Sequence, residues 1–305
     1  AAAMAGTATQ PATPVPGAEQ PDNTGVGVEA DAAEPSWDMP VTRNDQVDFF
    51  IEFLMGKNRD KTQLWLERTG RYGPLIREEL RKAGMPEDLL YLAMIESGLD
   101  PNAYSKAHAA GIWQFIAPTG QRYGLEVSDY VDERRDPVKA TRAALTYLKE
   151  LNERFGGSWY LAAAGYNTGE NRVDRILREQ LGGARGDENL FWQIMDLLPR
   201  ETRDYVPVML AMGHIAKEPA KYGFDEVRLQ QPLDFREVRV PAGTKLDDIA
   251  HAAGVPADQV TELNPHLVRG MTPPDRDWNV RVPLGTETRV AAQFQSGPPT
   301  ASLAD

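Results

Sequence analysis

One carboxylate in the sequence combines an apolar setting with the end of a helix. In "AMIESGLDP", Glu96 follows Leu92 and Ala93 by four and three positions, which is the spacing of one face of a helix. We therefore expect Glu96 to point into the core, in the last turn before Gly98, where the helix dipole disfavours a negative charge. Burial and the dipole both favour the protonated carboxyl, which a general acid for cleavage of a glycosidic bond needs. A structural Glu paired with an arginine is the alternative.

Other polar residues with side chains suited to binding a sugar follow at several points of the chain. Gln114 offers both a donor and an acceptor, as recognition of an N-acetyl or hydroxyl group requires. Glu201 and Tyr205 are four positions apart and so share one face of a helix. Taken singly, each residue type also has a structural interpretation, such as a surface Gln, a turn Ser, a core Tyr or a capping Asn. The candidate site residues are Glu96, Ser105, Gln114, Tyr166, Asn167, Glu201 and Tyr205.

The order of these residues along the chain resembles a known family. "ESGLDPNAYS" is followed by "GIWQF" at residues 111–115, "GYN" at residues 165–167 and "LPRETRDYVP" at residues 198–207. This ordered set is similar to the catalytic core of the lytic murein transglycosylases, which have a lysozyme-like domain of the SLT and goose-lysozyme kind. The most similar subgroup is the membrane-bound lytic transglycosylase D type. Gly165 and Asn171 depart from the residues that are common in this family, Ala and Gly.

The resemblance implies a reaction and a role for each candidate residue. Glu96 would protonate the oxygen between N-acetylmuramic acid and N-acetylglucosamine and then remove the proton of the 6-hydroxyl, which closes a 1,6-anhydro ring without water. Tyr205 would donate a hydrogen bond to Glu96. Substrate would be bound by Ser105, Gln114, Tyr166, Asn167, Glu201 and Tyr205. Two alternatives stay open: a hydrolytic muramidase like goose-type lysozyme, and a non-catalytic protein that binds the cell wall.

The elements that must position these residues are predicted to be helices. Helical periodicity runs almost without a break through residues 45–222, including a helix at residues 87–97. Asp136 followed by Pro137, and Ser158 further on, are typical helix starts. The sequence therefore predicts a mainly α fold, with a lysozyme-like helical catalytic domain.

A second, smaller unit is predicted at residues 234–285. "REVRVPAG" and "NVRVPLG" alternate like strands, while "TKLDDIAHAAG", with Thr244 as its N-cap, and "VPADQVTELNP" have the pattern of short helices. This βααβ unit looks like a divergent LysM module, for which glycan binding and a packing role both stay open. Residues 1–40, rich in Ala, Pro and Glu, are expected to be a disordered tether, and residues 286–305 a flexible tail.

Composition limits the classes of partner. The formal net charge is -12 and no dense basic cluster is present, which argues against nucleic-acid binding. The absence of cysteine and the scattered four histidines argue against a metal site, and no cofactor is expected. The family implies peptidoglycan glycan strands as partner and the periplasm of a Gram-negative bacterium as location. It also implies a lipid anchor in the full-length precursor, on the outer membrane, and we expect a monomer.

Overall fold

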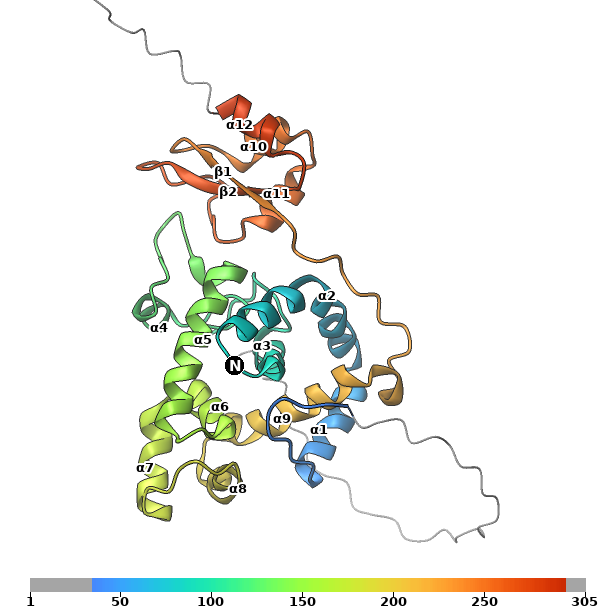
Figure 1. Cartoon of the computed structure of the whole chain (residues 1–305), viewed down its shortest axis with the longest axis vertical. Helices are drawn as coiled ribbons and strands as arrows, with labels where there is room; N and C mark the ends of the chain where they lie inside the picture. The colour runs from blue at the N-terminus through green and yellow to red at the C-terminus, as the bar shows by residue number, and fades with distance from the viewer. Residues whose placement is uncertain (1–34, 295–305) are drawn as a thin grey trace, which may run out of the picture.

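The computed structural model describes residues 35–294, in which two folded units follow one another along the chain (Figure 1). The larger unit is helical. Within the described residues it consists of α1 (Asp45–Met55), α2 (Arg59–Lys82), η1 (Glu87–Leu89), α3 (Leu90–Ser97), α4 (Ala117–Arg122), η2 (Glu133–Arg135), α5 (Pro137–Arg154), α6 (Trp159–Thr168), α7 (Glu170–Leu181), α8 (Asn189–Ile194), η3 (Met195–Leu197), α9 (Arg200–Lys217) and η4 (Pro219–Tyr222), where η marks a short 3-10 helix.

The helix starts predicted at Asp136 and Ser158 are confirmed. The carboxylate of Asp136 accepts hydrogen bonds from the N–H groups of Val138 and Lys139 at 2.9 and 3.0 Å, which caps α5. The hydroxyl of Ser158 accepts from the N–H of Leu161 at 3.2 Å and caps α6. The helix predicted at residues 87–97 differs in one respect, because its first turn is the 3-10 helix η1.

Helix α3 lies inside the helical unit. All of its residues are buried, and it packs against α2 and α9. Helix α6 packs against α5 and α9 through a run of small residues, where a Cβ at Gly165 would come within 2.8 Å of the ring of Phe155. The core of this unit is therefore built around the helix that carries Glu96.

The smaller unit has the predicted order of strands and helices. It consists of β1 (Arg236–Val240), α10 (Leu246–Ala253), α11 (Ala257–Leu263), β2 (Trp278–Val282) and α12 (Glu287–Phe294). The two strands are antiparallel, and Val238 lies opposite Val280 in the unit's own core. The prediction of a mainly α protein with a small βααβ unit is therefore confirmed. No helix between residues 35 and 294 has the length and apolar character that crossing a membrane requires.

Two predictions in the smaller unit need correction. Helix α12 lies where a flexible tail was predicted, and its Val290 is fully buried against the unit's core. Thr244 is not the N-cap of α10; Lys245 stands at that position, without a side-chain cap. The hydroxyl of Thr244 instead donates to the carbonyl of Pro241 at 2.7 Å. Val290 is buried by residues that only the tertiary structure brings together, whereas the hydroxyl of Thr244 bonds to a carbonyl three residues earlier instead of capping α10.

The N-terminal prediction is also wrong in part. Residues 37–39, near the end of the tether predicted at residues 1–40, pack onto the helical unit. The ring of Trp37 makes an edge contact with Tyr91, with 5.9 Å between ring centroids, and Met39 is buried in the core. Residues 1–34, on which the rest of that prediction falls, lie outside the described residues.

Candidate active site

Glu96 lies in the last turn of α3 with only 3% of its surface exposed. Gly98 ends the helix in the left-handed conformation, with φ of 64°, and its N–H donates to the carbonyl of Met94 at 2.7 Å. A Cβ at Gly98 would lie 2.0 Å from Nε1 of Trp65, so a glycine is required for both reasons. The predicted inward position of Glu96 at the helix end is confirmed.

Two phenol groups lie close to this carboxylate. The hydroxyl of Tyr205, on α9, donates a hydrogen bond to Oε1 of Glu96. The hydroxyl of Tyr166, on α6, donates to the carbonyl of Trp113 at 2.8 Å. Burial, and after it the charge of Glu96, raises the pKa of both tyrosines well above the usual value. Both hydroxyls therefore keep their protons at neutral pH and can serve as donors.

A loop that follows α3, residues 103–115, carries two further candidates; we call it the glutamine loop. The hydroxyl of Ser105 is buried and accepts from the N–H of Ala109 at 3.0 Å. Nε2 of Gln114 donates to the carbonyl of Gly111 at 2.9 Å. Gln114 has a φ of 50°, in the left-handed region that few residues other than glycine adopt. These bonds hold the loop closed, and contacts of either side chain with a sugar stay a prediction.

Asn167 is held between two residues at the start of α9. Its Nδ2 donates to Oε1 of Glu201 at 3.2 Å, and its Oδ1 accepts from the hydroxyl of Thr202 at 2.7 Å. The sequence placed Asn167 and Glu201 among the candidates but missed Thr202. Its position directly after Glu201, inside the "ETRDY" segment, was the available signal. The amide of Asn167 is therefore fixed in orientation by two partners.

Two other polar residues, Ser97 and Thr141, form hydrogen bonds with the glutamine loop and were missed by sequence reasoning. The hydroxyl of Ser97, next to Glu96, donates to the carbonyl of Ile112 at 2.9 Å. Nε1 of Trp113 donates to the hydroxyl of Thr141, on α5, at 2.9 Å. Ser97 was visible in the motif but had no assigned role, and nothing in the local sequence marks Thr141. The loop is thereby bonded to both α3 and α5.

The candidates thus come from α3, the glutamine loop, α6 and α9. Glu96 with Tyr205, and Asn167 with Glu201, form direct pairs. An edge contact between the rings of Phe115 and Tyr166, 6.2 Å between centroids, joins the loop to α6. In the described part of the chain, no three His, Cys, Asp or Glu side chains are grouped as a metal ion needs. The arrangement offers one buried acid beside hydrogen-bond donors, which suits proton transfer.

Comparisons with known protein families give a match for each unit. Residues 74–188 match the family described as Transglycosylase SLT domain, and residues 234–297 match Lytic transglycosylase MltD, LysM-like domain. The first match includes Glu96, Ser105, Gln114 and the Tyr166-Asn167 pair. The second extends beyond the predicted boundary at residue 285, in agreement with α12. The resemblance drawn from the order of the motifs is confirmed by these matches.

Individual relatives agree with the family matches. Over 189 residues the chain is 38% identical to the membrane-bound lytic murein transglycosylase D of Escherichia coli strain K12. The aligned region covers 62% of this chain and 41% of that protein. Over 104 residues it is 36% identical to the peptidoglycan transglycosylase gp16 of Escherichia phage T7, covering 33% of this chain and 8% of that protein. The chain therefore spans less than half the length of these relatives.

Among solved structures, the 70 kDa soluble lytic transglycosylase SLT70 from Escherichia coli is similar over 60% of this chain and 31% of its own length. The sequence identity is 21% and the TM-score is 0.42.

Proposed function

We propose that this chain, which joins a transglycosylase SLT domain to an MltD-type LysM-like domain, is a peptidoglycan lytic transglycosylase. It would cleave the β-1,4 bond between N-acetylmuramic acid and N-acetylglucosamine without water and leave 1,6-anhydro ends. The observation that carries the proposal is the burial of Glu96 beside the hydroxyl of Tyr205. Glu96 lies inside residues 74–188, which match the SLT family, and Tyr205 follows that segment on α9.

The reaction that we propose needs one carboxyl in two roles. Glu96 first gives its proton to the glycosidic oxygen, and the bond from that oxygen to C1 of the muramic acid breaks. The acetamido oxygen of the same sugar stabilises the positive charge at C1. The carboxylate of Glu96 then takes the proton of the 6-hydroxyl, whose oxygen bonds to C1 and closes the anhydro ring. Glu96 is protonated again at the end, so no water and no second acid is consumed.

The neighbours of Glu96 fit these two roles. Tyr205 donates to Oε1 and so orients the carboxyl, and the raised pKa of its phenol keeps the donor proton in place throughout. For the other candidates we propose contacts with the sugar: Ser105 and Gln114 from the glutamine loop, Tyr166 and Asn167 from α6, and Glu201 from α9. Asn167, fixed by two partners, presents a preoriented group at low entropic cost.

The location that we propose follows from the relatives. The relative from Escherichia coli is described as membrane-bound and acting on murein. We propose that this protein acts in the periplasm of a Gram-negative bacterium, as a monomer, with a lipid anchor on the outer membrane supplied by the full-length precursor. Fractionation of cells that produce the full precursor, with detergent release from outer membranes, tests this placement.

The test of the reaction is a digest of purified cell walls followed by mass analysis of the released muropeptides. We expect products lighter by one water than the reducing fragments that a hydrolase releases. Glu96→Gln should release them about 10³ times more slowly, whereas Glu153→Gln, at an exposed glutamate of α5, should behave like the wild type. Reducing ends would assign the protein to the hydrolytic muramidases. No release by the wild type, with binding to the wall retained, would identify a non-catalytic binding protein.

A further inference from the structure

A loop of the helical unit packs into the LysM-like unit. The loop comprises residues 126–136, and we call it the acidic loop. Val131 forms an antiparallel bridge with Leu267, and the N–H of Asp132 donates to the carbonyl of His266 at 2.9 Å. The side chain of Val131 is fully buried in the core cluster of the LysM-like unit. The acidic loop is therefore completed by residues of the second unit.

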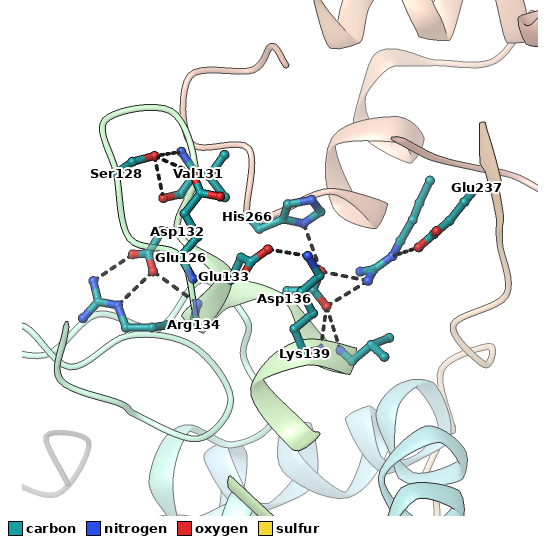
Figure 2. A network of polar contacts seen from close by, with 12 residues as sticks. Glu126, Ser128, Val131, Asp132, Glu133, Arg134, Asp136, Lys139, Glu237 and His266 are labelled. Atoms are coloured by element: carbon teal, nitrogen blue, oxygen red, sulfur yellow. Dashed lines mark hydrogen bonds and ion pairs between the residues drawn. The ribbon is translucent and has the colours of Figure 1, made fainter. Parts of the chain in front are cut away.

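A buried ion pair holds the end of this loop at Asp136, whose polar contacts are drawn in Figure 2. Both carboxylate oxygens of Asp136 accept from Nη2 of Arg281 on β2, each at 2.8 Å. Asp136 is 1% exposed and Arg281 is 3% exposed, so water does not weaken the interaction. The same carboxylate caps α5. Loss of Arg281 would leave a buried charge without its main cationic partner at the start of that helix.

The acidic loop in turn holds the glutamine loop. Nε and Nη2 of Arg134 each donate to a carboxylate oxygen of Asp132 at 2.8 Å. From this fixed position, Nη1 of Arg134 donates to the carbonyls of His108 and Phe115, at 2.8 and 3.1 Å. The side chain of Arg134 is buried, so few other donors can replace it. The guanidinium of Arg134 thus connects Asp132, which is bonded to the LysM-like unit, with both ends of the turn that contains Gln114.

The backbones of the two loops also touch. Gly111 has a φ of 79°, and a Cβ at this position would lie 1.8 Å from the carbonyl oxygen of Arg134. Within the same turn, His108 and Gln114 have φ values of 61° and 50°. Such conformations of residues other than glycine cost free energy and persist only where the surroundings enforce them. The contacts with Arg134 are the enforcing surroundings on this side of the loop.

We propose that the LysM-like unit is a positioning element of the active site, which holds the glutamine loop in shape through Asp136, Asp132 and Arg134. The effect on turnover rests on the proposed function, because the loop carries Ser105 and Gln114. Arg134 and Arg281 are positioning residues, since neither touches the reacting atoms. In this role the unit contributes to cleavage of any substrate, including one too short to reach it.

The test compares Arg281→Met with Arg239→Met, a matched control on β1 whose ion pair with Asp277 is exposed and stays within the LysM-like unit. Amide hydrogen exchange is measured on the intact chain, well below the unfolding temperature of each variant. In Arg281→Met we expect the amides of His108, Ala110 and Gln114 to exchange about tenfold faster or more, because the opening of a loop sets that rate. Arg239→Met should leave these rates unchanged.

The second measurement is kcat/KM on a short soluble peptidoglycan oligosaccharide. Misplacement of the loop should lower it about tenfold in Arg281→Met and leave it unchanged in Arg239→Met. If Arg281→Met is folded and both the exchange rates and kcat/KM match the wild type, the proposal is overturned. Loss of activity on whole cell walls alone would mean that the unit only binds glycan, which also overturns it.

The exchange measurement tests the coupling between the units separately from the proposed function, and a second variant is available. Exchange is measured without substrate, so an inactive wild-type protein would refute the proposed function and leave the coupling between the units to be judged by exchange alone. If Arg281→Met does not fold, Arg276→Met breaks the partly exposed ion pair with Glu126, at 2.6 Å, on the same loop, together with a pair to Asp275 inside the LysM-like unit. A smaller rise in exchange at His108 and Gln114 supports the proposal, and unchanged rates there contradict it.

Discussion

Two regions of the molecule are each built around a buried carboxylate, and they differ in what faces the charge. Asp136, between the two units, accepts from the guanidinium of Arg281 and from two backbone N–H groups. Burial acts to raise its pKa, but the charge of Arg281 and these hydrogen bonds outweigh it, so the pKa lies below the usual value. Glu96, in the core of the helical unit, accepts from the neutral phenol of Tyr205. The partners, and not burial alone, distinguish a structural acid from a candidate for proton transfer.

The largest contrast is expected from matched amide substitutions at the two acids. Glu96→Gln should lower turnover by a factor of about 10³, because it removes the only group that we propose to carry the proton. The free energy of unfolding should change little, since Gln has nearly the same shape and can still accept from Tyr205. Rates of muropeptide release and thermal unfolding measure the two quantities. Turnover within a factor of two of the wild type would assign the chemistry elsewhere.

Asp136→Asn should lower the free energy of unfolding much more than Glu96→Gln does. It leaves Arg281 buried with only the longer pair to the half-exposed Glu237, at 3.7 Å, and weakens the cap of α5, so we expect a loss of about 3 kcal/mol in the free energy of unfolding. Asp48→Asn, which breaks the exposed pair with Arg43, is the control and should cost less than about 1 kcal/mol. Denaturant unfolding measures both. Equal losses for the two variants would mean that the buried pair contributes no more to the free energy of unfolding than the exposed pair does.

The next largest effect is a pH dependence of the free energy of unfolding, which arises at His266 beside Asp136. Burial lowers the pKa of His266 to about 4. The charges of Arg281 and Lys139 act in the same direction, and the charge of Asp136 acts to raise the pKa. The unfolded chain therefore binds a proton near pH 6.5 that the folded chain does not, so stability is full above that pH and falls toward pH 4. We expect a loss of about 2 kcal/mol between pH 7 and pH 4.5 from this group.

The measurement is denaturant unfolding across that pH range in the wild type and in His266→Gln, which cannot take up the proton. The variant should have a flatter profile, whatever its stability at pH 7. Parallel profiles would show that His266 titrates normally in the folded protein, and hence that the contact between the units is more hydrated than its burial indicates.

The smallest effect is expected at Tyr205. Tyr205→Phe removes one hydroxyl from Glu96 and should lower turnover about tenfold, the cost of one hydrogen bond to a charged group. The ring stays in place, so folding should survive. Steady-state rates at several pH values measure the change and show whether the acid limb of the profile moves. An unchanged rate would mean that Tyr205 does not control the carboxyl during the reaction.

Much of the fold was predictable because its signals are local. The caps at Asp136 and Ser158, the glycine after Glu96 and the alternation in β1 and β2 act over a few residues. The candidate site was visible as an ordered set of motifs, and the contacts of its residues with substrate stay a prediction. The pairing of Tyr205 with Glu96 came from the resemblance, and helical spacing alone did not show it. Thr202, Thr141 and the docking of Trp37 were missed because each depends on a partner far along the chain.

The sequence by itself determined most helices of the larger unit, several of the helix ends, and that one acid lies on an apolar helix face at a helix end. Only the tertiary structure decided what each acid faces. Asp136 was readable as a cap, yet its partner Arg281 lies 145 positions away, and Arg134 meets the carbonyl of His108 across 26 positions. The reason is physical: periodicity and capping act within a few residues, whereas charge pairs and loop contacts form only when packed elements bring distant residues together.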